Sequence, residues 1–526
     1  MGRPRLSEQQ KLAKALEELR QIIGSDHGVV RGNQLKNSTR VLLLEKRFLR
    51  EVLKGWYFVS DPSADLGDTT LFYANFWEYL AHYLNDRFDN KYCLTAEYSM
   101  LRHSRYNLVP RQINVILATN QSQIQTLAYQ HSLVMYPGGN NFPKEECVVN
   151  MEGLRCMSVP YCLVVLTPNT FRTYPEEVQL VLGTLDNPSA IAALVGVNAS
   201  GIGRLIGAFR AIGRNDFANS IVSQLSGINI KVTEDNPFET PPIYMLGSPD
   251  KTPLYARIKM LWAKHRQTVL TKRPQAAASG ISNETYLEQV EATKINDAYH
   301  SLSIERYRVT HELIEKVAKG LWSPETNPGD KQQIEAMAAR GYLEAFQLVK
   351  ESAGTAFTDR YNQQTTAKLF IDNHQKWFQK LFMPSVDAGI LDIHDLIGYR
   401  RQMVFLRGSL HSPPHYDYVR DAMTALQECF ESEDDAFVRA VLGHWLFGFI
   451  HPYMDGNGRM ARFTMNLMLA SGGYPWTIIR VENRDRYMAA LESASVEQDL
   501  EPFATFVADC IQSCAWDFSG LAESKK

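Results

Sequence analysis

The residues with the clearest chemical potential lie in one short segment, HPYMDGNGRMAR, which runs from His451 to Arg462. Gly456, Asn457 and Gly458 permit backbone angles at which successive N–H groups point at one anion. A helix that begins there adds the partial positive charge of its N-terminus. The segment therefore predicts a cradle for a phosphate group.

The charged side chains of this segment suit different tasks around such an anion. Arg459 and Arg462 are three residues apart, so they share one face of the expected helix, where two guanidinium groups can bind neighbouring phosphates. Asp455 offers a hard oxygen for Mg²⁺ that bridges phosphate oxygens. His451 is largely neutral near neutral pH and can accept a proton from an attacking hydroxyl. The expected chemistry is transfer of a phosphate-containing group.

Two apolar runs flank the segment and predict the helices that hold it. The run before it places large apolar residues at helical spacing, at Phe437, Val441, Trp445 and Phe449. The run after it ends at Gly472 and Gly473, with Pro475 just beyond, as helices commonly do. We expect Tyr453 to anchor the loop between the helices by burying its ring.

The segment resembles the signature of the Fic family (filamentation induced by cAMP), HPFxDGNGRxxR. It matches at every polar and glycine position, and Tyr453 stands where phenylalanine is usual. The resemblance implies a mainly α fold with a helical catalytic domain. It also implies that the domain transfers AMP from ATP to a Ser, Thr or Tyr hydroxyl of a protein, which can be the chain itself. Mg²⁺ is the implied cofactor, with His451 as the base and Asp455 as the metal ligand.

The resemblance implies the nucleotide-binding residues in the same way: Gly456, Asn457, Gly458, Arg459, Arg462, Asn483 and Tyr487. Asn457 and the loop amides would position the α-phosphate, while the two arginines hold the β- and γ-phosphates. Asn483 and Tyr487 fall where the family lines its adenine pocket. The alternative for Tyr487 is a plain core position.

A short β-hairpin is expected upstream of the signature. MVFLRG alternates like a strand, and the chain can return after Pro413 and Pro414. By its position this hairpin is similar to the family's target-docking flap, on which a substrate segment adds as an edge strand. The expected flap residues are Met403, Val404, Phe405, Leu406, Arg407 and Gly408.

The sequence SLSIER, from Ser301 to Arg306, resembles the family's inhibitory helix, [ST]xxxE[GN]. The resemblance implies that Glu305 pairs with Arg462 and blocks productive binding of the γ-phosphate. Arg306 stands where glycine or asparagine is usual, which puts the close backbone approach of that turn in question. The alternative is an ordinary surface ion pair between Glu305 and a neighbour such as Arg308.

The composition indicates a globular chain with several domains. It has 526 residues, 45% of them hydrophobic and 21% charged, with a net charge of -3, which excludes a disordered or uniformly basic protein. Its seven cysteines lack the spacing of a metal site or a disulfide scaffold. A polar N-terminus and short apolar runs predict neither a signal peptide nor a membrane span. We expect a cytoplasmic protein.

The front of the chain is basic, with 12 Lys and Arg against 6 Asp and Glu in residues 1–60. A helix over residues 7–23, a short segment, a helix through residues 42–52 and the strand-like GWYFVS predict a winged helix that binds DNA. Basic residues on or beside its third helix are Arg40, Lys46, Arg47 and Arg50, and the arm at residues 2–5 suits a minor groove. Together with the stretch from KGWYFV to YNLVPRQINVI, this region also resembles bacterial abortive-infection antitoxin regulators. The alternative is a solvated basic helix pair.

These patterns predict four parts: a winged-helix-like domain at 1–62, a mixed α/β regulatory region at 63–245, a helical region with the inhibitory helix at 246–380, and the catalytic core at 381–526. The run CLVVLTP predicts a strand in the second part. Two other functions stay open: an enzyme of the same family that removes AMP or transfers another phosphate-containing group, and a DNA-binding regulator whose Fic domain senses nucleotide.

Overall fold

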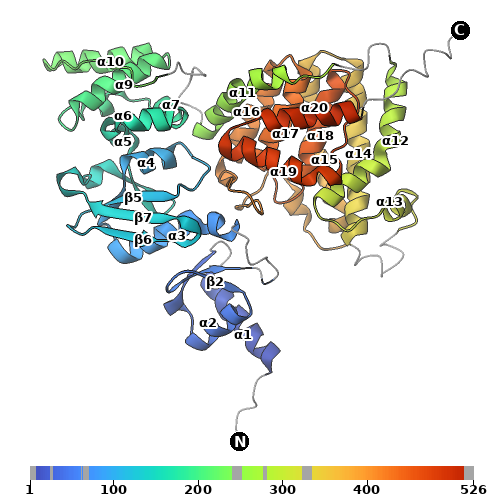
Figure 1. The fold of residues 1–526 in the computed structure, drawn as a ribbon, viewed down its shortest axis with the longest axis horizontal. Helices are drawn as coiled ribbons and strands as arrows, with labels where there is room; N and C mark the ends of the chain where they lie inside the picture. The colour runs from blue at the N-terminus through green and yellow to red at the C-terminus, as the bar shows by residue number, and fades with distance from the viewer. Residues whose placement is uncertain are drawn as a thin grey trace, which may run out of the picture. The chain divides into compact units, whose positions relative to one another are not determined.

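A computed structural model describes residues 7–23, 28–60, 62, 70–239, 252–275, 281–322 and 334–514. The chain divides into two compact units, which Figure 1 draws in the colours of the sequence. One unit is Met1–Pro253 with Val404–Pro413, and the other is Leu254–Met403 with Pro414–Lys526. The predicted basic arm at residues 2–5 lies outside the described residues.

Residues 7–23 and 28–60 form a small module of helices on a sheet. Its elements are α1 (Glu8–Ile23), β1 (Val29–Arg31), α2 (Asn37–Glu45), β2 (Leu49–Leu53) and β3 (Trp56–Val59). The strands pair antiparallel in the order β1-β3-β2. The residues that join helices and sheet in one apolar core include Leu19, Val30, Leu43 and Tyr57.

The predicted helix over residues 42–52 is wrong beyond Glu45. The helix ends there, Arg47 takes a left-handed φ of 64°, and Gly55 at φ 84° closes a tight hairpin between β2 and β3. Arg50 therefore lies on a strand, half-buried between the buried Leu49 and the exposed Glu51. The short segment expected between the two helices contains a 3-10 turn at residues 32–34.

The rest of the first unit mixes helices and strands, as the sequence predicts. Its main sheet has the order β4-β5-β7-β6, with β5 and β7 parallel and the other pairs antiparallel. The strands are β4 (Tyr92–Leu94), β5 (Gln112–Leu117), β6 (Gln123–Thr126) and β7 (Ser132–Pro137), with a separate hairpin of β8 (Val148–Met151) and β9 (Leu154–Met157). The helices are α3 (Thr70–Phe88), α4 (Ala96–His103), α5 (Val159–Val165), α6 (Pro168–Thr173), α7 (Pro175–Gly183), α8 (Pro188–Ala192), α9 (Ala199–Ala211) and α10 (Asn215–Gly227).

The strand predicted at CLVVLTP is wrong, because most of this run belongs to α5. Pro160 lies in the first turn of that helix, a position that favours a helix start. Cys162, Leu163 and Val164 are all fully buried. A short run that is apolar on every side has no period that separates strand from helix.

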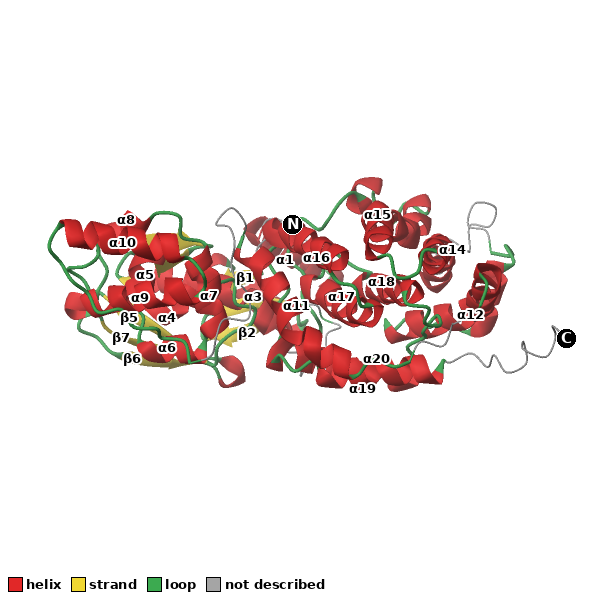
Figure 2. Ribbon diagram, turned by 90° about the horizontal axis from the view of Figure 1, so that it is seen from above, coloured by secondary structure: helices red, strands yellow, loops and turns green. Residues whose placement is uncertain are grey.

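Every regular element among the described residues of the second unit is a helix, which confirms the mainly α prediction. Its helices are α11 (Pro253–Thr271), α12 (Asn283–Ile304), α13 (His311–Ala318), α14 (Ile334–Thr358), α15 (Gln363–Asp387), α16 (Val419–Ser432), α17 (Ala436–Ile450), α18 (Asn457–Ser471), α19 (Arg484–Glu492) and α20 (Glu501–Ser513). Figures 1 and 2 show α17 and α18 side by side, and α18 also packs against α14 and α15. Nearly every residue of this central pair is buried, including the four predicted core residues of α17.

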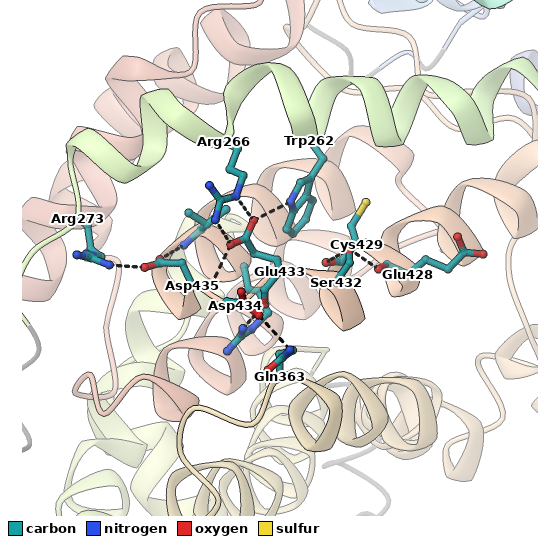
Figure 3. A network of polar contacts seen from close by, with 12 residues as sticks. Trp262, Arg266, Arg273, Gln363, Glu428, Cys429, Ser432, Glu433, Asp434 and Asp435 are labelled. Atoms are coloured by element: carbon teal, nitrogen blue, oxygen red, sulfur yellow. Dashed lines mark hydrogen bonds and ion pairs between the residues drawn. The ribbon is translucent and has the colours of Figure 1, made fainter. Parts of the chain in front are cut away.

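A polar network fixes α11 to the turn between α16 and α17 (Figure 3). The buried Glu433 accepts hydrogen bonds from Arg266 Nε at 2.6 Å, from Arg266 Nη2 at 2.9 Å and from the backbone N–H of Asp435 at 3.0 Å. The fully buried Arg439 donates to the backbone oxygen of Glu433 and to Ser471 Oγ at the end of α18. The network therefore ties the start of α17 to two other helices.

The predicted hairpin at Met403–Gly408 does not form. These residues have no strand pairing, and Gly408 takes a left-handed φ of 79° in a turn. Pro413 and Pro414 lack the N–H groups that a returning strand needs. The N–H group just before them, that of Ser412, donates a hydrogen bond to the backbone oxygen of Asn107, which belongs to the same unit.

Within the described ranges, no helix combines the length and the apolar character needed to cross a bilayer.

Candidate active site

The signature loop joins the two central helices of the helical unit. α17 ends at Ile450, His451 takes a left-handed φ of 53°, and Gly456 at φ 78° leads into α18. The Asn457 side chain braces this loop in both directions: its Oδ1 accepts from the Tyr453 N–H at 2.9 Å and its Nδ2 donates to the Tyr453 oxygen at 2.8 Å. The loop is therefore held rigidly at the N-terminus of α18.

Tyr453 anchors the loop, as the sequence predicts. Its ring is 1% exposed and stacks on Phe378 with 3.8 Å between ring centroids. The side-chain amide of Asn457 is already used by this tyrosine, so the backbone amides of the loop remain as the groups that suit a phosphate.

His451 is held as a neutral imidazole. Its Nδ1 lies 3.2 Å from the backbone oxygen of Gly448, and a hydrogen donated from Nδ1 to that oxygen leaves Nε2 as a proton acceptor. Burial and the charge of Arg400 lower the pKa of His451 to about 4, although the Gly448 hydrogen bond opposes the shift. The imidazole is therefore ready to act as a base at neutral pH.

Asp455 is the only signature carboxylate, and it faces outward. Its side chain is 67% exposed. One oxygen accepts from the Gly456 N–H at 2.6 Å and the other lies 3.4 Å from Arg459 Nη2. No group of three or more His, Cys, Asp or Glu able to hold a metal occurs in the described part of the chain. A Mg²⁺ ion here would take one carboxylate oxygen and complete its shell with phosphate and water, which suits this ion.

Arg459 lies between two aromatic rings. Its guanidinium carbon is 4.9 Å from the Phe382 ring centroid and 5.4 Å from that of Tyr307, and only 1% of the residue is exposed. Its Nε has no hydrogen-bond partner. Such stacking stabilises a cation while it covers the faces of the guanidinium.

Arg462 is held by the last turn of α12. Its Nε donates to Ser301 Oγ at 2.9 Å, and its Nη2 donates to the Ser301 backbone oxygen at 3.1 Å and to Glu305 Oε1 at 2.8 Å. Burial alone would raise the pKa of Glu305, but the charge of Arg462 lowers it below its usual range. The pair expected from the sequence is therefore present as an ion pair.

Glu305 also covers the predicted phosphate cradle. A Cβ atom on Gly458 would lie only 2.2 Å from Glu305 Oε1, so this glycine is what allows the close approach. The carboxylate thus sits over the first turn of α18, where an anion is favoured.

The turn after Glu305 explains the usual glycine of the inhibitory pattern. Arg306 takes a left-handed φ of 68°. The Arg306 N–H bonds the Ser303 oxygen at 3.0 Å, and the Tyr307 N–H bonds the Leu302 oxygen at 3.1 Å. These two bonds define a Schellman cap, whose left-handed position favours glycine. Arg306 keeps the geometry at a cost in backbone strain.

The two predicted adenine-pocket residues lie in different surroundings. Tyr487 is 1% exposed, and its hydroxyl is 2.7 Å from Nε2 of the fully buried His444. Asn483 is exposed at the end of a 3-10 turn at residues 481–483. Tyr487 therefore has the packing of a core residue.

Three functional candidates carry no sequence signal of their own. Tyr307 covers Arg459, and Arg484 Nε donates to the Ile304 oxygen at 2.9 Å at the end of α12. Arg400 Nε donates to the His451 oxygen at 2.8 Å. Each lies far along the chain from its partner, and only a position next to a known motif, as for Tyr307, could have drawn attention to it.

Comparison with known proteins places this site in a family. The model of the Fic/DOC family matches residues 364–469, which run from the start of α15 nearly to the end of α18. The chain carries a Fic domain. The matched stretch contains the whole signature loop and both central helices.

Curated relatives match the same part of the chain. Protein adenylyltransferase Fic of Drosophila yakuba is 32% identical over 161 residues, which are 27% of this chain and 32% of that protein. Protein adenylyltransferase Fic of Nematostella vectensis is 37% identical over 118 residues, 22% of this chain and 27% of that protein. The chain therefore spans about a third of the length of these relatives.

Among solved structures, residues 134–508 of Fic-1 from C. elegans are 16% identical, with a TM-score of 0.36, and the match covers 70% of this chain and 92% of that one. A Fic domain containing signaling protein from Bacteroides thetaiotaomicron is also 16% identical, with a TM-score of 0.32, and the match covers 48% and 95%. Scores this low describe a loose likeness.

Proposed function

We propose that the chain is a protein adenylyltransferase that moves AMP from ATP to a Ser, Thr or Tyr hydroxyl of a protein substrate. The observation that carries the proposal is the loop itself, which brings a neutral imidazole, glycine-lined amides at a helix N-terminus and two buried arginines together. The seven cysteines of the chain are free thiols, which suits the predicted cytoplasmic location.

The proposed reaction follows from the protonation state of His451. Nε2 takes the proton of the target hydroxyl as its oxygen attacks the α-phosphorus of ATP. The bond from that phosphorus to the bridging oxygen breaks, and pyrophosphate leaves. The amides at the start of α18 and the guanidinium groups of Arg459 and Arg462 stabilise charge on the phosphates. When bound, Mg²⁺ would be held by Asp455 and would neutralise phosphate charge.

We propose that the last turn of α12 inhibits this reaction. Glu305 holds Arg462 and lies over the cradle at Gly458, while Tyr307 covers Arg459. A triphosphate needs both guanidinium groups, so this turn must move before ATP binds productively. Inhibition would thus depend on two contacts made by residues only two positions apart.

Intact-mass spectrometry of the full chain with Mg²⁺ and ATP tests the reaction. We expect the Glu305→Gly variant to gain the mass of AMP, and the double variant with His451→Ala to gain none. Equal labelling of both variants would contradict His451 as the base.

Isotope labelling distinguishes the alternative reactions of the same site. Incorporation from ATP labelled at the α-phosphate but not at the γ-phosphate indicates AMP transfer. Incorporation of the γ label indicates transfer of another phosphate-containing group. Loss of AMP from a labelled protein on incubation with Glu305 intact, and not in Glu305→Gly, indicates AMP removal.

We propose DNA binding as a second function, for residues 1–62. α2 exposes Asn37, Ser38 and Val41, whose amide, hydroxyl and methyl groups suit base edges. Lys46 and Arg47 are exposed just after the helix. Titration of the full chain with a fluorescent duplex should show affinity that falls steeply with salt, and Lys46→Ala with Arg47→Ala should flatten that slope. No salt-dependent binding would reject the proposal.

A further inference from the structure

Arg400 is a buried arginine that holds the backbone at three places. The residue is 5% exposed. Its Nε donates to the His451 oxygen at 2.8 Å, its Nη1 donates to the Gln402 oxygen at 3.0 Å, and its Nη2 donates to the Pro414 oxygen. Its backbone N–H donates to the Pro452 oxygen at 2.9 Å. One side chain therefore connects the signature loop to both ends of the segment 403–413.

The partners of Arg400 are unusual for a buried cation. All three acceptors of its guanidinium are carbonyl oxygens, and no carboxylate of the described chain pairs with it. Burying an unpaired charge is costly, and burial lowers the pKa of Arg400 to about 10. Arg266, which serves the scaffold in Figure 3, instead pairs with the carboxylate of Glu433. A cation held only by carbonyls is suited to fixing backbone geometry.

The three carbonyls lie at chemically important places. Gln402 and Pro414 lie on either side of the segment 403–413, which forms no hairpin, so Arg400 joins the chain before that segment to the chain after it. His451 is the proposed base. Its backbone takes the left-handed conformation, and its carbonyl oxygen accepts the hydrogen bond from Arg400 Nε. The positive charge of Arg400 also favours the neutral form of the imidazole.

We propose that Arg400 is a positioning residue that ties the backbone at Gln402 and Pro414 to the backbone of His451, so that the imidazole is held in place to receive the proton of an incoming hydroxyl. The inference rests on the proposed adenylyl transfer. An error of about 1 Å in such a placement costs about a hundredfold in rate. Arg400 bonds residues 402, 414, 451 and 452 and not the cradle at Gly456–Gly458, so we expect ATP binding to change little.

The test uses the full chain in a Glu305→Gly background. Arg400→Lys keeps the charge but cannot span three carbonyls, and Arg400→Met removes both. Arg401→Met is the matched control, because Arg401 is adjacent and exposed. The measurements are the self-labelling rate at saturating ATP across pH, and the ATP dissociation constant by calorimetry.

We expect both Arg400 variants to label at least about tenfold more slowly, with an ATP dissociation constant within about twofold of the parent. Arg400→Met should also move the acid limb of the pH profile toward neutral pH, because the imidazole loses a repelling charge, while Arg400→Lys should not. Arg401→Met should label like the parent. An Arg400→Lys rate equal to the parent, or a loss of ATP binding parallel to the loss of rate, would overturn the inference.

A parent that labels nothing would reject the adenylyl-transfer proposal instead. In that case, hydrogen exchange tests whether Arg400 holds the backbone at these residues. Faster amide exchange at residues 402–414 and 451–452 in Arg400→Met, with Arg401→Met unchanged, supports the bridge. Unchanged exchange in Arg400→Met rejects it.

Discussion

Two arginine–glutamate pairs in the helical unit have opposite burial. In the pair between α11 and the start of α17, the side chain of Glu433 is 3% exposed and that of Arg266 is 43% exposed. In the pair beside the signature loop, the side chain of Arg462 is 5% exposed and that of Glu305 is 31% exposed. The first pair buries its acid and the second buries its base.

The difference separates a scaffold from a contact that can open. Glu433 accepts several hydrogen bonds at the junction of α16 and α17, so it cannot leave without unsatisfied partners. Glu305 is the partly exposed residue that caps α12, and it is followed by the strained Arg306. Only the acid of the second pair can move without disturbing the core.

Removing Glu305 should therefore raise the activity, whereas removing Glu433 should lower the stability of the helical unit. The change in activity is the largest effect we expect. Glu305→Gly should raise the self-labelling rate about 10- to 100-fold, since a charge-assisted hydrogen bond contributes about 1.5–3 kcal/mol. Glu433→Gln should leave the rate unchanged and destabilise the helical unit by about 3 kcal/mol. Mass spectrometry and thermal melting measure the two. A higher self-labelling rate in Glu433→Gln would contradict the distinction between the two pairs.

The second contact of the α12 turn should add a smaller effect. Tyr307→Leu should raise the labelling rate about twofold to fivefold, because Arg459 loses a stacking partner worth about 0.5–1 kcal/mol and a cover over its face. Tyr307→Phe keeps the ring and should behave like the parent. Equal rates for the leucine and phenylalanine variants would exclude a role for the ring face.

Relieving the strain at Arg306 should strengthen the inhibition. Arg306→Gly places glycine at the left-handed cap position and should stabilise the turn by about 1 kcal/mol. This corresponds to a labelling rate about fivefold lower. Arg308→Gly, at an exposed position just beyond the turn, is the control. A faster Arg306→Gly variant would show that the side chain of Arg306, not its strain, governs the turn.

The smallest expected effect is that of pH near neutrality. The pKa of Glu305 is lowered, so its pair is complete above the ordinary glutamate pKa and is lost only as the pH falls through the lower folded-state value. The pKa of His451 is about 4, so the imidazole stays neutral over the same window. Labelling by the parent and by Glu305→Gly should both stay flat from about pH 6 to pH 8. A step near pH 6.5 in either would contradict this assignment.

The amino-acid sequence predicted much of the helical unit. The two helices predicted on either side of the signature segment are present, because long apolar periods with clear ends leave little choice. The predictions for three short segments were wrong, because a short segment contains too few residues to show a period. Residues 46–52, Cys162–Leu166 and Met403–Gly408 are too brief or too uniformly apolar for a period to separate helix, strand and turn.

By itself, the sequence indicated which residues come together in the signature loop, because glycines, a histidine and two arginines at fixed spacing lie in one short stretch of backbone. It also indicated Glu305 through a neighbouring pattern. Only the tertiary structure decided that Arg400 joins three carbonyls, that Tyr307 covers Arg459 and that Glu305 lies over Gly458. These contacts join residues up to about 150 positions apart, and such distances are set by how helices pack, which no local pattern records.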